Sequence, residues 1–388
     1  MAGRGSTITL GDAGRLLRPA SFGTMVKPAG SACNLGCTYC YYLEKAALYG
    51  GRERVMDEDL LEAYIKQYFA ANESDEVSFC WHGGEPLLLG IEYFRKALAL
   101  QKKYADGRRV LNSLQTNGTK VNDAWCRFFH TNGFLVGISL DGPRDIQDHF
   151  RRTSAGAPTF DSVMAAISLF KRYGVDFNTL SVVSSRCEGR GAEIYRFFRD
   201  EVGSHYMQFL PAANRDLPWA VSGKGYGQFL NDVFDEWIRR DVGQYYVQMF
   251  DATLSRWCGL APGVCTINEV CSDSLTVEHN GDVYPCDHFV SPQTLLGNIR
   301  EKSLKEIFDS KPRIDFSIAK RDSLPRECRR CEWLFTCFGE CPEHRVDGKN
   351  VLCEGLKDYF GHVAGAMDRM RALLAEGKAP ALIMDENV

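Results

Sequence analysis

The chain has 388 residues, of which 45% are hydrophobic and 25% are charged, and its formal net charge is −4. These values are typical of a globular protein with a substantial buried core, in one large or two medium domains. The slightly acidic balance gives no field that would attract nucleic acid, and no apolar run is long enough to span a bilayer. Residues 1–17 lack the apolar core of a signal peptide, so we expect a cytoplasmic protein.

The chain contains 15 cysteines, which is many for a protein of a reducing compartment. Disulfides would not persist there, the count is odd, and several spacings are short. Clustered thiols in this setting are more often metal ligands than disulfide partners. The sequence therefore predicts metal centres rather than a disulfide framework.

Apolar runs alternate with amphipathic stretches from residue 24 to about residue 210. We expect strands at 24–27, 77–81, 110–115, 135–140, 177–183 and 206–210. Helical patterns lie between them, at 57–71, 93–104, 122–130, 160–173 and 192–200. Strand–helix alternation with connections of this length indicates parallel β/α units. Six such units favour an α/β fold built on a partial (β/α)6 barrel, whose chemistry lies at the C-terminal ends of the strands.

The pattern changes after the sixth expected strand. We interpret 211–225, which includes Gly223, as a flexible loop that precedes helices at 227–240 and 245–257. Nine cysteines then occur among turn residues between Cys258 and Cys353, and metal clusters would stabilise so irregular a segment. A closing helix is expected at 356–374. The predicted organisation is an N-terminal extension at 1–23, the barrel at 24–225, linking helices at 226–258, a cysteine-rich domain at 259–360, and a C-terminal helix and tail at 361–388.

Three thiols, Cys33, Cys37 and Cys40, follow the first expected strand with the spacing C-x3-C-x2-C. Three thiolates cannot fill all four positions of a zinc site or of a [4Fe–4S] cluster. A cluster held by them has an open iron for a substrate or cofactor, whereas a zinc knuckle would need a fourth ligand from elsewhere. The spacing, with Tyr39 just before the last cysteine, resembles the signature of radical S-adenosylmethionine (SAM) enzymes. The resemblance implies that Tyr39 belongs to the cofactor site, that the open iron binds SAM, and that reduction yields a 5′-deoxyadenosyl radical.

Two glycines and a glutamate, Gly83, Gly84 and Glu85, follow the second expected strand. Glycines at a strand end let the backbone approach a ligand closely, although Gly-Gly alone is more often a turn. Placed after the cysteine motif, this segment resembles the GGE motif with which radical SAM enzymes hold the amino group of SAM. The neighbouring His82 is interpreted equally well as a packed histidine or as a substrate contact.

The same resemblance implies further SAM contacts from later strands. Ser139, at the end of the fourth expected strand, would form a hydrogen bond to SAM, and Arg151 would contact its carboxylate. Backbone groups near Ala213, after the sixth strand, would line the adenine. Without the neighbouring motifs, Ser139 is typical of a turn-capping hydroxyl and Arg151 of an exposed helix charge.

Eight cysteines of the C-terminal half form a second pattern. A single C-x2-C pair would suggest a zinc ribbon. The whole series resembles the SPASM domain, which binds two auxiliary [4Fe–4S] clusters in peptide-modifying radical SAM enzymes. The resemblance implies interleaved ligands: Cys265, Cys271, Cys286 and Cys341 for the first auxiliary cluster, and Cys328, Cys331, Cys337 and Cys353 for the second. Eight ligands for two clusters leave no open iron, so these clusters would carry electrons.

The motifs together resemble those of the anaerobic sulfatase-maturating enzymes, in the stretches 33–45, 115–118, 135–143, 281–287 and 296–299. The likeness implies oxygen-independent oxidation of a cysteine or serine, in a Cys/Ser-x-Pro-x-Arg segment of a sulfatase, to Cα-formylglycine (3-oxoalanine). The adenosyl radical would remove a hydrogen atom from the target Cβ, and Asp287, directly after Cys286, would accept a proton. The implied cofactors are SAM and three [4Fe–4S] clusters, one that binds SAM and two auxiliary. A low-potential donor such as flavodoxin or ferredoxin would supply electrons.

Two other interpretations stay open. A related SPASM maturase would form thioether or carbon–carbon crosslinks in a ribosomal peptide, although the roughly thirty residues before Cys33 are too few for the peptide-binding domain that such enzymes often carry. A non-catalytic electron carrier, or an interaction protein stapled by zinc, would need neither a SAM pocket nor an open iron. None of the three interpretations involves nucleic acid or a membrane.

Overall fold

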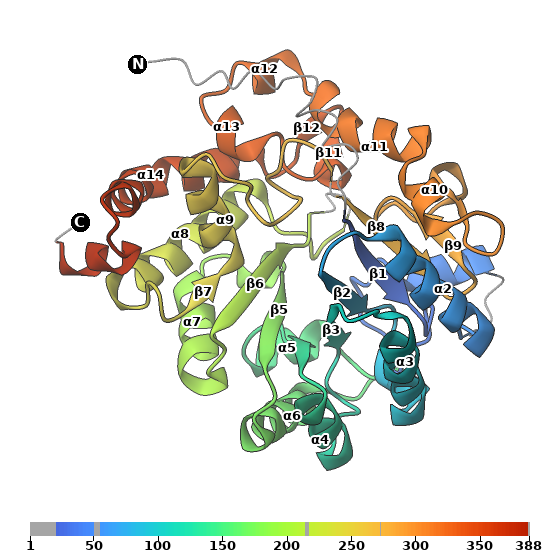
Figure 1. The fold of residues 1–388 in the computed structure, drawn as a ribbon. Helices are drawn as coiled ribbons and strands as arrows, with labels where there is room; N and C mark the ends of the chain where they lie inside the picture. The colour runs from blue at the N-terminus through green and yellow to red at the C-terminus, as the bar shows by residue number, and fades with distance from the viewer. Residues whose placement is uncertain (1–20, 50–54, 214–216, 272, 387–388) are drawn as a thin grey trace. The chain divides into compact units, whose positions relative to one another are not determined.

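The computed structural model describes residues 21–49, 55–213, 217–271 and 273–386, which form two compact units. The first unit contains the described residues of 1–32, 44–113 and 272–319, and the second unit contains those of 33–43, 114–271 and 320–388. Most of the expected N-terminal extension lies outside the described residues. Each unit therefore combines stretches that are far apart in the sequence (Figure 1).

The first unit is built by pairing around β1 (Gly23–Lys27). This strand pairs in parallel with β2 (Glu76–Trp81) on one side and with β8 (Ser274–Glu278) on the other. β8 continues into an antiparallel ribbon with β9 (Asp282–Tyr284) and β10 (Gly297–Asn298). Because β8 belongs to the cysteine-rich region, a late segment of the chain is the direct neighbour of the first strand.

Helices pack on the first unit through apolar faces whose residues recur with the period of a helix. α2 (Glu58–Ala71) begins where Oδ1 of Asp57 accepts the backbone N–H of Leu60 at 2.8 Å, which satisfies one of the free donors of the first turn. The buried face of α2 contacts β1, where the hydroxyls of Tyr64 and Thr24 lie 2.6 Å apart. The remaining helices of this region are η1 (Leu43–Tyr49), η2 (Pro86–Leu89), α3 (Ile91–Tyr104), η5 (Pro292–Thr294), α10 (Leu304–Phe308) and α11 (Lys311–Asp322).

In the second unit, parallel pairing joins β4 (Phe134–Ser139), β5 (Phe177–Val183), β6 (Tyr206–Pro211) and β7 (Tyr246–Val247) in that order. A separate antiparallel pair is formed by β11 (Arg345–Val346) and β12 (Lys349–Asn350). β3 (Arg109–Thr116) runs along the sequence from the first unit into the second. All six expected strands are present, and the predicted α/β class with parallel strands is confirmed. The described helices of the second unit are α4 (Asp123–Thr131), α5 (Arg144–Phe150), α6 (Phe160–Tyr173), η3 (Ser185–Cys187), α7 (Gly191–Arg196), the π-turn η4 (Phe197–Val202), α8 (Gly223–Arg240), α9 (Gln248–Trp257), α12 (Arg326–Arg329), α13 (Leu334–Cys337), η6 (Pro342–His344), α14 (Cys353–Ala375) and η7 (Pro380–Asp385). Among the described helices, none is long and apolar enough to cross a membrane.

The expected flexible loop around Gly223 is wrong. The segment is the first turn of α8, and Oγ of Ser222 caps it by accepting the N–H of Gly225 at 2.9 Å. Glycine allows α8 to pack closely against α14, because a Cβ placed on Gly227 would lie 2.4 Å from the carbonyl oxygen of Gly355. Glycine lowers intrinsic helix propensity, but here it allows two helix backbones to approach closely.

Two expected helix boundaries are also wrong. The helix expected from residue 245 begins at Gln248, because Tyr246 and Val247 form strand β7 beside β6. The closing helix begins at Cys353 rather than at 356, so the predicted domain end at 360 falls inside α14. Neither position carries a helix-breaking residue that would have marked the boundary in the sequence.

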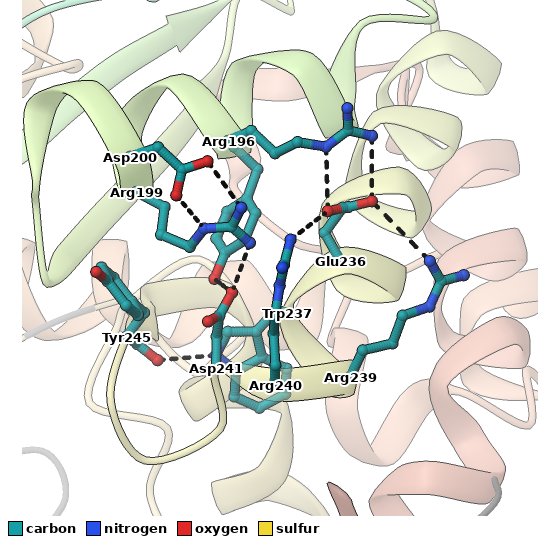
Figure 2. Close-up of polar contacts among 10 residues, drawn as sticks. Arg196, Arg199, Asp200, Glu236, Trp237, Arg239, Arg240, Asp241 and Tyr245 are labelled. Atoms are coloured by element: carbon teal, nitrogen blue, oxygen red, sulfur yellow. Dashed lines mark hydrogen bonds and ion pairs between the residues drawn. The ribbon is translucent and has the colours of Figure 1, made fainter.

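An ion network, buried at Arg199 and Asp241 but exposed at Asp200 and Arg196, joins the segment 195–200 to α8 (Figure 2). Arg199, whose side chain is 8% exposed, lies between Asp200 and Asp241, with Nε 2.7 Å from Asp200 and Nη1 3.1 Å from Asp241. Asp241 also accepts the hydroxyl of Tyr195 at 2.8 Å, and Arg196 pairs with Glu236 at 3.1 Å. Because the buried charges of Arg199 and Asp241 are paired with each other, neither is left isolated.

Candidate active site

Backbone hydrogen bonds to the segment that follows α5 hold the Cys33–Cys40 loop of the second unit in place. The N–H of Gly36 donates to the carbonyl of Arg152 at 2.9 Å, and the N–H of Ser154 donates to the carbonyl of Asn34 at 3.1 Å. Cys37 is buried, whereas Cys33 and Cys40 are half-buried.

The three thiols of this loop interact electrostatically. Burial raises the pKa of Cys37 to about 11, Arg151 opposes the rise, and Cys40 and Cys33 add to it. A thiol in this position resists ionisation unless a metal replaces its proton. Two N–H donors also reach Sγ of Cys33, from Leu35 at 3.4 Å and from Asn117 at 3.7 Å. Three thiols in one loop that interact electrostatically, one of them with N–H donors to its sulfur, fit a three-thiolate iron–sulfur site.

Tyr39, Asp141 and Arg151 form a buried cluster beside this loop. The hydroxyl of Tyr39 donates to Oδ2 of Asp141, Nε of Arg151 lies 3.1 Å from the same oxygen, and the guanidinium carbon of Arg151 lies 5.4 Å from the centre of the Tyr39 ring. Burial lowers the pKa of Arg151, but Asp141 and Tyr39 raise it by more, so the guanidinium stays charged. Arg151 has five N–H donors, so it can hold a second anion while it pairs with Asp141.

The sequence analysis did not single out Asp141. Its position directly after the fourth strand, in Ser-Leu-Asp-Gly-Pro, was the available signal. In the structure this aspartate is 1% exposed, and its Oδ1 accepts the N–H of Val182 at 3.0 Å. It therefore fixes both the end of β5 and the orientation of Arg151.

Ser139 and Ala213 lie at the C-terminal ends of β4 and β6. Oγ of Ser139 accepts the side-chain amide of Gln115 at 3.0 Å and keeps its own proton available to a ligand. Ala213 is 8% exposed and follows Ala212, whose N–H donates to the carbonyl of Val183 at 2.9 Å. The structure thus places both predicted contacts at the same end of parallel strands, where β/α proteins carry their chemistry.

Gly83, Gly84 and Glu85 form a tight turn in the first unit. The N–H of Gly84 donates to the carbonyl of Gly30, and that of Glu85 donates to the carbonyl of Ala32, both at 2.8 Å. A Cβ on Gly84 would lie 2.0 Å from the carbonyl oxygen of Ala32, and Gly83 has a φ of 114°, so both positions require glycine. Glu85 is fully buried, and its carboxylate accepts the N–H of Leu87 at 3.0 Å.

His82, Lys27 and Asp287 form a cluster in the first unit. Nζ of Lys27 lies 3.9 Å from Oδ2 of Asp287, and Nδ1 of His82 accepts the N–H of Gly83 at 2.8 Å. Burial and the charge of Lys27 together lower the pKa of His82 to about 4, although Asp287 opposes the shift. The histidine is therefore neutral at physiological pH. Lys27 gave no signal in the sequence, because a lysine at a strand end is usually exposed.

Four cysteines of the second unit line one cavity. The cavity walls include Cys328, Cys331, Cys337 and Cys353, together with Trp333 and Phe360. Burial raises the pKa of Cys337 to about 12. These four are the predicted ligands of the second auxiliary cluster, and their convergence on one cavity fits a cubane with four thiolates.

The predicted ligands of the first auxiliary cluster come from both units. Cys265, Cys271 and Cys341 belong to the second unit, and Cys286 belongs to the first. A buried lysine, Lys320, lies close to Cys265. Its Nζ donates to the carbonyls of Cys265 and Thr266 at 2.6 and 2.7 Å. Burial lowers the pKa of Lys320, and Cys271, Glu340, Cys265 and Cys341 oppose this shift, so all three thiols act on the same ammonium. Of the other cysteines, Cys126 and Cys187 are buried, and Cys80 and Cys258 are half-buried.

Two parts of the chain match known protein domains, and the whole chain is similar to known enzymes. Residues 28–185 match the radical SAM superfamily, and residues 265–332 match SPASM, an iron–sulfur cluster-binding domain. The chain is 43% identical to a serine-type anaerobic sulfatase-maturating enzyme of Bacteroides thetaiotaomicron, over 93% of this chain and 94% of the relative. It is 34% identical to a cysteine-type anaerobic sulfatase-maturating enzyme of Clostridium novyi, over 88% of this chain and 94% of the relative.

A solved structure described as native anSMEcpe with bound AdoMet and Cp18Cys peptide also superposes on the fold. The TM-score is 0.84 and the identity is 31%, over 91% of this chain and 99% of that one. Together with the two domain matches, the fold and the cysteine motifs define a radical SAM enzyme with a SPASM domain. The chain belongs to the family of anaerobic sulfatase-maturating enzymes.

Proposed function

We propose that this enzyme oxidises a serine or cysteine of a sulfatase to Cα-formylglycine without oxygen. The observation that carries the proposal is the likeness to sulfatase-maturating enzymes over nearly the full length of both chains. The higher identity to the serine-type relative favours serine as the preferred target. An oxidation must dispose of a proton and an electron. Asp287 beside Lys27 supports a role in taking the proton, and eight cysteines that would leave no open iron in two auxiliary clusters support electron transfer.

The residues would divide the work as follows. Cys33, Cys37 and Cys40 would hold the SAM-binding cluster, with Gly83, Gly84, Glu85, Ser139, Arg151, Tyr39 and Ala213 forming the SAM site. Cys265, Cys271, Cys286 and Cys341 would hold one auxiliary [4Fe–4S] cluster, and Cys328, Cys331, Cys337 and Cys353 the other. When bound, SAM and its cluster supply an adenosyl radical that can remove a hydrogen atom from an unactivated carbon.

Asp287 would accept the proton of the target hydroxyl or thiol. Its carboxylate is 16% exposed and lies next to the buried ammonium of Lys27, which holds it in one orientation. Loss of one hydrogen atom, one proton and one electron converts the serine CH₂–OH group to an aldehyde. From cysteine the same losses give a thioaldehyde, which water hydrolyses with release of hydrogen sulfide.

The test is anaerobic reconstitution followed by reaction with peptides that contain Ser-x-Pro-x-Arg or Cys-x-Pro-x-Arg. Mass spectrometry of the product should show a carbonyl at the target residue, and deoxyadenosine should form with it. An intramolecular crosslink in a peptide would instead support the crosslinking maturase. Iron and sulfide analysis should give about twelve of each per chain for three [4Fe–4S] clusters. A protein that contains zinc alone, or that fails to cleave SAM under reduction, would overturn the proposal.

The physiological setting belongs to the same proposal. A cytoplasmic location would keep the clusters reduced and the thiols free of disulfides. A flavodoxin or ferredoxin would supply the low-potential electron that starts each turnover. Activity with either purified protein as the reductant, compared with dithionite, tests this assignment.

A further inference from the structure

The segment between Cys337 and Cys341 of the second unit has a left-handed backbone. Three consecutive residues, Phe338, Gly339 and Glu340, have φ angles of 45°, 72° and 50°. Two of the three are not glycine, so this conformation is costly and persists only where the surrounding contacts fix it. The segment begins at a predicted ligand of the second auxiliary cluster, and we therefore asked which contacts hold it there.

Arg345 holds the backbone of this segment. Its guanidinium donates to the carbonyls of Phe338 at 2.9 Å, of Gly339 at 3.0 Å and of Glu340 at 3.1 Å. The N–H of Glu340 donates in turn to the carbonyl of Cys337 at 2.8 Å. The position of Glu340 next to Cys337 is thus fixed by backbone contacts, before its side chain is considered.

The side chain of Glu340 is a buried carboxylate. The residue is 2% exposed, and its Oε2 accepts Nδ2 of Asn350 at 2.6 Å and lies 2.7 Å from Nδ1 of His344. The same imidazole lies 3.3 Å from the carboxylate of Glu343, so the two carboxylates outnumber the one possible cation in either state of the imidazole. An amide oxygen could accept the same hydrogen bonds at a lower cost of burial, so hydrogen bonding alone does not require a charge here.

This carboxylate lies directly behind the wall of the cavity that the four thiols share. Its chain neighbour Gly339 and its hydrogen-bond partner Asn350 both line that cavity, together with Cys337. Burial raises the pKa of the Cys337 thiol, and Glu340 adds to the rise, so its charge acts on this sulfur. A fixed negative charge close to an iron–sulfur cluster opposes the gain of an electron.

The cations around the cavity are more exposed than Glu340. Arg345 is half-buried and opposes the rise that burial causes in the pKa of Cys328. Lys349 and Lys357 line the cavity but are exposed. Water and salt screen exposed charges far more than buried ones. Among these charges, that of Glu340 should therefore be the least screened.

We propose that the buried carboxylate of Glu340 lowers the reduction potential of the second auxiliary cluster, and that Asn350 and His344 hold it beside Cys337. This inference rests on the proposed function, because it supposes that the four thiols of the cavity bind a [4Fe–4S] cluster. Glu340 acts through that cluster and does not touch the substrate. A cluster of lower potential passes its electron on more readily, so Glu340 keeps the second cluster from retaining the electron that it receives.

The test is a redox titration of the anaerobic, cluster-loaded enzyme, followed by EPR, which gives a midpoint potential for each cluster. Glu340→Gln keeps the shape and an oxygen that accepts the same hydrogen bonds, but it removes the charge. We expect one-electron reduction of the second auxiliary cluster to become about 10- to 100-fold more favourable, a rise of about 59 to 118 mV. The matched control is Glu343→Gln: this carboxylate also lies beside His344 but is 41% exposed, so the change should stay below about 3-fold.

Lys349→Gln identifies which midpoint belongs to the second auxiliary cluster. Lys349 lines the cavity with a side chain that is 52% exposed, so loss of its charge should make reduction of that cluster about 2- to 5-fold less favourable. The midpoint that falls in this variant should be the one that rises in Glu340→Gln. Shifts of opposite sign for opposite charges distinguish an electrostatic effect from general loosening of the site.

Iron analysis accompanies each titration and separates the possible failures. An unchanged midpoint in Glu340→Gln, with about twelve irons per chain present, would overturn the inference and leave the proposed function standing. Loss of the cluster from Glu340→Gln would also overturn it, because the carboxylate would then be needed for assembly. A shift of equal size in Glu343→Gln would contradict the role given to burial. Unmodified enzyme with only about eight irons would overturn the proposed cluster assignment as well.

Discussion

The ammonium of Lys27 lies 3.9 Å from Oδ2 of Asp287, and the lysine side chain is fully buried. The two residues are 260 positions apart in the sequence, and the parallel pairing of β1 with β8 brings their segments together. A lysine is rarely buried without a partner, because loss of its hydration is costly. The pair therefore identifies Asp287 as a carboxylate that the fold holds in place, which a positioned base requires.

Replacement of Asp287 by asparagine should lower the rate of formylglycine formation about 10²- to 10⁴-fold, the usual contribution of a positioned base. The amide keeps the size of the side chain but cannot accept the proton. Product is quantified by mass spectrometry under single-turnover conditions. Peptide affinity serves as the control and should stay unchanged, whereas an undiminished rate would show that another group takes the proton.

Replacement of Lys27 by methionine should reduce the free energy of unfolding by about 3 kcal/mol, because it leaves the Asp287 carboxylate without its buried cation. Urea unfolding under anaerobic conditions measures the change. The double variant Lys27→Met, Asp287→Asn removes both charges and should be more stable than Lys27→Met alone. If the double variant is less stable than the single one, the charge pair does not account for the loss.

His82 should make stability depend on pH between about 4 and 6.5. Its folded-state pKa is lowered to about 4 by burial and by Lys27, whereas the unfolded chain has a pKa near 6.5. Within this window the unfolded chain binds a proton that the folded chain does not, so stability falls as the pH falls. The contribution is fully present above pH 6.5, and the loss amounts to at most about 3 kcal/mol.

The variant His82→Gln isolates this effect. Glutamine does not titrate, so the variant should lose part of the slope of unfolding free energy against pH in this window. Paired denaturant titrations at several pH values measure both slopes. Identical slopes would mean that His82 is not held neutral in the folded state.

Replacement of Arg199 by methionine should destabilise the second unit by about 3 kcal/mol, because it leaves the buried Asp241 with Tyr195 but without its cation (Figure 2). Differential scanning calorimetry measures the loss. Arg144→Met is the matched control: Arg144 also pairs with an aspartate, Asp161, but both side chains are exposed, so the change should stay below about 1 kcal/mol. Equal losses in the two variants would contradict the role given to burial.

The sequence predicts the β/α region well because each strand and helix there has its own period. β5 has the expected bounds, Phe177–Val183, and the other five strands differ by one or two residues. The motif residues Ser139 and Arg151 also lie where a strand end and a following helix would place them. Local pattern is sufficient in this region because each element buries one face.

Contacts between residues far apart in the sequence have no such local pattern. β8 has five residues and no periodic neighbours, so its pairing with β1 could not be read from either strand. Gly223 and Gly227 resemble a loop until the facing backbone at Gly355 is known. Lys27 acquires its importance from Asp287, 260 positions away, and Asp141 accepts the hydroxyl of Tyr39, 102 positions away.

The pairing of β8 with β1 also sets the order of events during synthesis. The first strand leaves the ribosome early, but its second neighbour follows only after about 270 residues have been made. Until then one edge of β1 has unpaired N–H and C=O groups, which can pair with another chain. The N-terminal half is therefore not an independent module to which a cluster domain was appended, and a nascent chain would depend on protection of that edge until the cysteine-rich segment arrives.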